Sequence, residues 1–141
     1  MNLSFLDRYQ DFGLLIIRIG IGIAYMFHGF PKLFSGPERW ESLGEATYHV
    51  GIDFIPVFWG FIGASAEFFG GVLLILGLFF RPATIALFLT MAVATASHLG
   101  SGDPFTVFSH PLKMAILFFG LFFMGPGRHS MDRKIIFQVR R

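Results

Sequence analysis

The sequence predicts an all-α integral membrane protein built as a four-helix bundle, and two observations carry this prediction. Hydrophobic residues make up 54% of the 141 residues and charged residues only 14%, whereas an average soluble domain carries about 25% charge. The apolar residues also gather into four runs long enough for a helix to cross a bilayer, which takes roughly 20 residues. We therefore expect a single transmembrane domain over residues 1–141, with no second, soluble domain.

The four predicted helices cover residues 13–34, 54–79, 83–99 and 107–124, and residues 125–141 form a C-terminal tail. The first run is too long for the apolar part of a signal peptide and lacks a small-residue cleavage site, so we expect it to remain as a membrane anchor. A short segment, Phe80-Arg81-Pro82, separates the second run from the third. It predicts a tight antiparallel turn, with Pro82 at the start of the third helix.

The loop after the first run has a pattern of its own. Four of its residues fall near helical spacing, namely Trp40, Leu43, Thr47 and Val50, and three glutamates take the other side, Glu38, Glu41 and Glu45. One interpretation is a short helix lying on the membrane interface with Trp40 as its anchor. The alternative is an irregular lid.

Basic residues are distributed unevenly between the two predicted sides of the membrane. One side carries Arg8, Arg81, Arg128, Arg133, Lys134, Arg140 and Arg141, while the other carries Lys32 and Arg39 among acidic residues. Lysine and arginine concentrate in cytoplasmic segments. We therefore expect an inner-membrane protein with both termini in the cytoplasm. Because topology explains the basic residues and the net charge of +2, we expect membrane lipid and no nucleic acid as a partner.

The sequence contains no cysteine. This excludes thiol–disulfide chemistry, cysteine-ligated iron–sulfur clusters and thiolate zinc sites within the chain. We expect no metal site.

Polar residues inside the predicted spans are the candidate functional residues, because a lone ionised side chain in a bilayer costs several kcal/mol. The predicted catalytic residues are His28, Lys32, Glu67, His98, His110 and Lys113, and the predicted cofactor-binding residues are Arg18, Tyr25, His28, Lys32 and Glu67. We expect all of them to point inward and most to converge in the outer half of the bundle. The alternatives are a structural Arg18–Glu67 ion pair, a Lys32 side chain that reaches the lipid head groups, and ordinary interfacial roles for His98 and His110.

These residue types suit proton-coupled chemistry. A histidine can relay protons near neutral pH, a lysine offers three hydrogen-bond donors, and a membrane carboxylate often belongs to a proton path. The set therefore predicts a site for a lipid-soluble quinone or for an anionic substrate. A haem held by two histidines is a further alternative, although no pair of histidines has a diagnostic spacing.

The order of several short motifs resembles the DoxX family of small four-helix membrane proteins, which is related to the DoxD subunit of thiosulfate:quinone oxidoreductase. The resemblance rests on Arg18 followed by the segments 27–29 (FHG) and 32–33 (KL), on segments 67–71 (EFFGG) and 77–83 (GLFFRPA), and on His98 with segment 125–132 (GPGRHSMD). It spans nearly the whole chain. It implies a four-helix inner-membrane bundle with a link to quinone-dependent oxidation of sulfur compounds, but it does not imply thiosulfate as the substrate.

Together these observations predict the membrane subunit of a redox complex that interacts with quinone and receives electrons from a protein partner. Two alternatives remain, a non-catalytic scaffold or assembly subunit for a partner enzyme, and a small-solute transporter. The glycine-rich helix faces also permit a homodimer.

Overall fold

The computed structural model describes residues 4–139 and confirms the predicted all-α membrane bundle. Four of its helices are long and apolar enough to cross a membrane. They are α1 (Gln10–Phe34), α3 (Pro56–Leu76), α4 (Phe80–Gly100) and α5 (Phe105–Met124). A 3-10 helix, η1 (Ser4–Tyr9), leads directly into α1.

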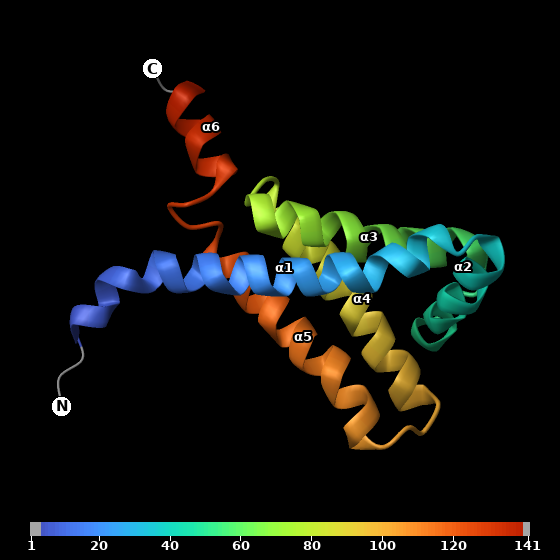
Figure 1. The fold of residues 1–141 in the computed structure, drawn as a ribbon. Helices are drawn as coiled ribbons and strands as arrows, with labels where there is room; N and C mark the ends of the chain where they lie inside the picture. The colour runs from blue at the N-terminus through green and yellow to red at the C-terminus, as the bar shows by residue number, and fades with distance from the viewer. Residues whose placement is uncertain (1–3, 140–141) are drawn as a thin grey trace.

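The four long helices form two antiparallel hairpins (Figure 1). Helices α1 and α3 pack along each other, α4 packs against α5, and the contact between α3 and α4 joins the two hairpins. The hairpins diverge toward the end that carries α2 (Figure 1). The beginning of α1, α6 and the α3–α4 turn lie on the opposite side from α2 (Figure 1). Which end faces the cytoplasm stays a prediction.

Glycines set the close approach of α1 to α3. A Cβ atom on Gly22 would lie 2.6 Å from the Cγ1 atom of Ile75 and 2.7 Å from the carbonyl oxygen of Gly71. A Cβ on Gly29 would collide with the backbone of Phe68. In lipid, helices associate through such close packing of small residues. The tight crossing brings the side chains of the two helices into direct contact near the α2 end.

The α3–α4 turn falls three residues earlier than the sequence predicts. Helix α3 ends at Leu76 because Gly77 adopts a left-handed φ of 63°. The N–H of Leu78 donates to the carbonyl of Leu73 at 3.1 Å, and that of Gly77 donates to Leu74 at 3.2 Å, which is the Schellman pattern of a helix end. Helix α4 then begins at Phe80 and includes the predicted turn residues in its first turn.

The loop after α1 is helical, in agreement with the first of its two interpretations. It contains α2 (Pro37–Gly44) and the 3-10 helix η2 (Glu45–Val50). The indole N–H of Trp40 donates to the carbonyl of Lys32 at 3.0 Å, and its ring packs edge-on against Phe61 at 4.9 Å. Trp40 therefore fastens α2 to the ends of α1 and α3. The predicted C-terminal tail also contains a helix, α6 (Met131–Val139).

Candidate functional site

An ion pair between α1 and α3 forms the centre of the candidate site. The Nζ atom of Lys32 lies 2.8 Å from Oε1 and 2.7 Å from Oε2 of Glu67. The Glu67 side chain is 6% exposed and that of Lys32 is 29% exposed. The carboxylate thus lies inside the helix pair, while the ammonium group remains accessible from the surface of the bundle.

Tyr25 lies on the same face of α1, two turns before Lys32. Its side chain is 5% exposed, and its ring packs edge-on against Phe118 of α5 at 4.9 Å. The hydroxyl group is buried and has no hydrogen-bond partner among the described residues. An unpaired buried hydroxyl costs about 1–3 kcal/mol, so a ligand atom that reached this one would recover that cost.

Aromatic rings cluster on the α1–α3 pair beside Phe68, the neighbour of Glu67. The rings of Phe30 and Phe34 are 4.8 Å apart, and Phe34 lies 6.2 Å from Phe68. Residues two positions apart on a helix do not share a face, so Phe30 and Phe34 lie across α1 from Lys32. His28, one turn before Lys32 and on the same side of α1, is exposed.

The expected inward convergence of all the polar residues is wrong for three of them. His28, His110 and Lys113 are exposed rather than turned into the bundle. On α5 the inward face is taken by a stripe of buried residues at helical spacing, Pro111, Ala115, Phe118 and Leu121. Since His110 and Lys113 fall outside that stripe, they face lipid or another protein. The catalytic roles predicted for them stay predictions.

His98 is separated from the Lys32–Glu67 site as well. It ends α4, where its Nδ1 atom lies 2.7 Å from the Oδ2 atom of Asp103 in the following loop. Both side chains are more than one third exposed. The predicted site residues therefore divide into two groups, one on α1 and α3 and the other at the α4–α5 end, which diverges from it (Figure 1).

Arg18 does not pair with Glu67, contrary to the structural alternative. It is 1% exposed, and its guanidinium donates to four backbone carbonyls at the other end of α1. Two of these carbonyls are at the end of α3, Leu74 at 3.0 Å and Ile75 at 3.1 Å, and two are in the loop after α5, Pro126 at 2.6 Å and His129 at 3.2 Å. Of these, the Ile75 carbonyl is one that a helix end leaves without an intrahelical partner, and the two loop carbonyls fasten the loop to α1. This geometry gives Arg18 a structural role, and the predicted binding of a cofactor by Arg18 stays untested.

Asp132 completes that end of the bundle. Its carboxylate accepts hydrogen bonds from the N–H groups of Phe79 and Phe80, both at 2.9 Å, and so caps the start of α4. Phe79 has a φ of 45°, which is unfavourable for a residue other than glycine. Asp132 therefore holds a strained turn in place.

Sequence reasoning missed the roles of Asp103 and Asp132, and the contacts of Trp40 with Lys32 and Phe61. Asp103 lies five residues after His98, too far apart for the helical neighbour rule that pairs residues three or four positions apart. Asp132 acts across 52 residues of chain, a separation for which a single sequence carries no signal. Trp40 was expected to anchor α2 in the interface, and a tryptophan at a membrane boundary is indeed typical of such an anchor.

The fold and the buried ion pair define this chain as a small polytopic α-helical membrane protein with charged groups inside its helix pairs. A family model described as DoxX matches residues 13–100. This is more than half of the chain, and the chain belongs to the DoxX family.

Two curated proteins show the same relationship over nearly the whole length. The chain is 31% identical over 144 aligned positions to the inner membrane protein YphA of Escherichia coli, with 90% of this chain and 97% of YphA covered. It is 30% identical to an uncharacterized protein of Haemophilus influenzae, with 92% and 95% covered. No solved structure matches significantly. The similarity to YphA and the four apolar helices identify an integral inner-membrane protein.

Proposed function

We propose that this chain is the quinone-binding membrane subunit of a redox complex, with the quinone head group at the Lys32–Glu67 pair. The observation that carries the proposal is an ion pair, on two membrane-spanning helices, whose carboxylate is buried and whose lysine side chain is partly exposed. A quinone reaches such a site through the membrane, without crossing water. Exposed aromatic rings on the same two helices, among them Phe30 and Phe34, suit a flat ring that approaches through the lipid.

The hydrogen-bond donors of the site fit the carbonyl oxygens of a quinone. An ammonium group has three donors, and the two carboxylate oxygens of Glu67 engage it without using all of them. The hydroxyl of Tyr25 has no partner among the described residues. Lys32 and Tyr25 thus each supply a donor that the protein itself leaves available.

The bound quinone would supply the electron-accepting group, and the protein residues would control protons and charge around it. Lys32 donates a hydrogen bond to a carbonyl oxygen and offsets the negative charge that reduction places there. Glu67, held against Lys32, accepts and returns protons, as membrane carboxylates on proton paths do. Electrons come from a partner protein that this proposal requires.

The first test is to measure quinone binding by the purified protein. Protein in mild detergent is extracted with organic solvent and analysed for quinone by mass spectrometry. It is then titrated with a short-tailed quinone while tryptophan fluorescence is followed, since Trp40 is bonded to the backbone of Lys32. We expect bound quinone and saturable quenching, with binding weakened at least about tenfold in Lys32→Met, because a hydrogen bond from a charged group is worth about 1.5–3 kcal/mol.

Three variants sharpen the result. Tyr25→Phe removes only the unpaired hydroxyl, and we expect weaker quinone binding with no loss of stability. Lys134→Met, in α6, is the charge-matched control and should bind quinone like the wild type. Lys113→Met tests whether the ammonium group of Lys113, on α5, contributes to quinone binding. An unchanged affinity would confine the site to α1 and α3.

Wild-type protein without quinone, together with equal quenching in Lys32→Met, would contradict the proposal. In that case the chain is better described as a scaffold or assembly subunit, and its buried charges serve stability alone. The rate of quinone reduction by the intact complex is a second test. An equal rate in the wild type and in Lys32→Met would likewise contradict the proposal.

A further inference from the structure

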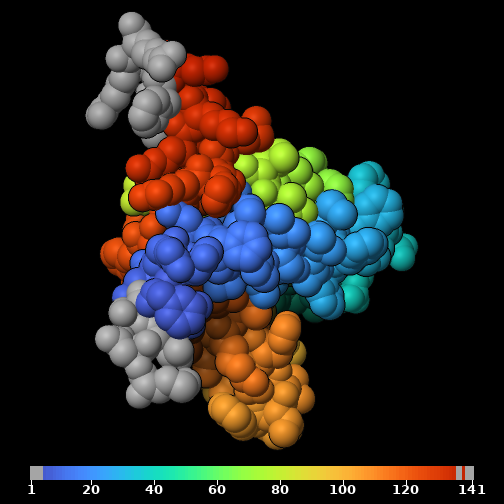
Figure 2. Space-filling view, turned by 60° about the vertical axis from the view of Figure 1, so that its left-hand side comes forward, coloured from blue at the N-terminus to red at the C-terminus, as the bar shows by residue number. Residues whose placement is uncertain are grey.

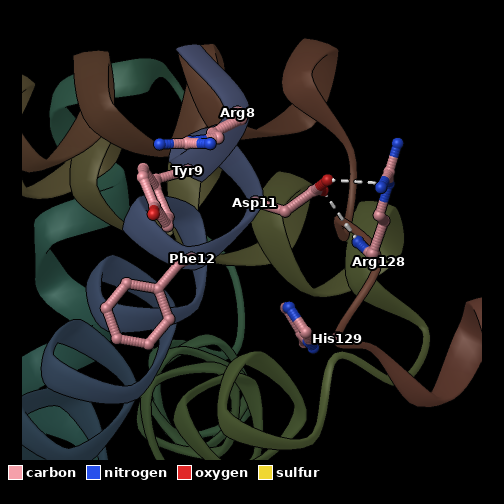
Figure 3. Close-up of a pocket in the computed structure, with 6 residues that line it drawn as sticks. All are labelled: Arg8, Tyr9, Asp11, Phe12, Arg128 and His129. Carbon is pink, nitrogen blue, oxygen red and sulfur yellow. Dashed lines mark hydrogen bonds and ion pairs between the residues drawn. The ribbon is translucent and has the colours of Figure 1, made fainter. Parts of the chain in front are cut away.

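A second polar site lies at the other end of α1. A pocket of about 370 Å³ is lined there by Arg8, Tyr9, Asp11, Phe12, Arg128 and His129 (Figure 3). These residues come from η1, from the first turn of α1 and from the loop between α5 and α6. The two segments that form the pocket are far apart in sequence, since 117 residues separate Asp11 from Arg128.

Specific contacts hold the loop against α1 and shape this pocket. Arg18 binds the carbonyls of Pro126 and His129, and the carboxylate of Asp11 binds Arg128 twice. Its Oδ1 atom accepts from the backbone N–H of Arg128 at 2.9 Å, and its Oδ2 atom lies 3.0 Å from Nε (Figure 3). In Figure 2 the loop before α6, in red, lies against the beginning of α1, in blue.

The charge of the pocket favours an anion. Two arginines and a histidine line the pocket with a single acidic residue, Asp11, and both oxygens of that carboxylate are engaged by Arg128. Asp11 holds Arg128 through its Nε atom, and the Arg128 side chain is 78% exposed. The Arg8 guanidinium lies over the ring of Tyr9, 5.1 Å from its centre. Arginine presents several N–H donors in a fixed plane, which suits phosphate oxygens.

The surface next to the pocket is apolar. Phe12 lines the pocket and is 55% exposed, and Ile16, one turn further along α1, is 57% exposed. Ile19 and Ile23 continue this exposed stripe into the span. Tyrosine and arginine at the end of a membrane helix are typical of the level of the lipid head groups. The basic pocket is thus continuous with an exposed apolar stripe of α1.

We propose that this pocket binds the phosphate-containing head group of an anionic phospholipid, with Arg8 and Arg128 contacting the head group. The acyl chains of the lipid lie along the stripe of Phe12, Ile16 and Ile23. Free inorganic phosphate shares the head-group chemistry but gains nothing from that stripe, so the two ligands can be separated by experiment. Bound lipid would fasten η1 and the loop after α5 to the membrane surface.

The test is native mass spectrometry of delipidated full-length protein in detergent, titrated with phosphatidylglycerol or with phosphatidylcholine. We expect the wild type to bind phosphatidylglycerol more tightly. Near an anionic membrane surface each arginine contributes about fivefold in affinity, so Arg8→Gln should weaken this binding about fivefold and Arg8→Gln/Arg128→Gln about 25-fold. Binding of phosphatidylcholine should change little.

Arg133→Gln in α6 is the matched control, because it removes the same charge next to the pocket without lining it. The proposal predicts wild-type lipid binding for this variant and no displacement of phosphatidylglycerol by millimolar inorganic phosphate. Equal binding of the two lipids would overturn it, as would an equal loss in Arg133→Gln, which would show a diffuse charge effect. Displacement by inorganic phosphate would assign the pocket to a soluble anion instead. If the double variant unfolds, Arg8→Gln alone decides.

Discussion

The two ends of the α1–α3 pair each hold a basic residue of α1, but they satisfy it in different ways. At one end Lys32 meets the side-chain carboxylate of Glu67. At the other end, about 21 Å away along the helix at 1.5 Å per residue, Arg18 meets four backbone carbonyls. The Lys32–Glu67 pair can exchange a proton or a partner. The contacts of Arg18 cannot change without releasing the main chain at the end of α3 and in the loop after α5.

The difference separates a chemical role from a structural one. The guanidinium of arginine stays protonated in proteins and has five donors in a fixed fork, so Arg18 suits carbonyls at the negative end of the α3 dipole. Lysine and glutamate in contact can both change protonation state. The Lys32–Glu67 end, with the unpaired hydroxyl of Tyr25 nearby, is therefore the end at which we place the chemistry.

The largest expected effect comes from Arg18→Gln. This substitution removes a buried cation and leaves several carbonyls without partners, and each unsatisfied buried group costs about 1–3 kcal/mol. We expect a loss of at least about 3 kcal/mol in the free energy of unfolding, measured by denaturation in mixed detergent micelles. Arg39→Gln, at an exposed position of α2, serves as the control and should unfold like the wild type. A loss below about 1 kcal/mol would refute the structural role of Arg18.

An intermediate effect is expected from breaking the Lys32–Glu67 pair. Removing one member of a buried pair costs about 3–5 kcal/mol when both charges are buried. Because Lys32 is 29% exposed, we expect about 2 kcal/mol for Glu67→Leu, in the same unfolding assay. The double variant Lys32→Met/Glu67→Leu should recover part of this loss, since it leaves no charge behind. Strict additivity of the two single changes would show that the residues do not interact, because residues in contact are coupled.

The partial recovery of stability in Lys32→Met/Glu67→Leu distinguishes the two ends most directly. No second side-chain substitution can restore Arg18→Gln, because its partners are main-chain carbonyls at the end of α3 and in the loop after α5. A rescue of Arg18→Gln by a change at Glu67 would therefore contradict the division of the molecule into a structural end and an exchangeable end.

The smallest expected effect is that of Asp132→Ala. This change removes the cap from the start of α4 and releases the strained turn at Phe79. Loss of a capping side chain costs about 1 kcal/mol, which thermal unfolding followed by circular dichroism will detect. Asp132→Asn keeps a capping oxygen and should lose less. A larger loss in Asp132→Asn than in Asp132→Ala would mean that capping is not the role of this residue.

Much of the candidate site could be anticipated from residue types. Lys32, Glu67 and Tyr25 were predicted because polar groups in a membrane span are costly and need a partner. The pairing itself was not predicted: the sequence suggested Arg18 as the partner of Glu67, whereas the partner in the structure is Lys32. The close approach at Gly22, Gly29 and Gly71 sets which α1 residues reach Glu67.

The sequence alone determined the class of the protein, because the length and hydropathy of its four apolar runs match the thickness of a bilayer. It also predicts the depth of each polar residue, since depth along a helix follows from counting residues. Only the tertiary structure decided which way each helix is turned. Lipid is as apolar as the interior of the bundle, so hydrophobicity does not distinguish the two faces of a membrane helix. For that reason the sequence did not reveal that His110 and Lys113 face outward, and the packing of α5 against α4 accounts for their direction.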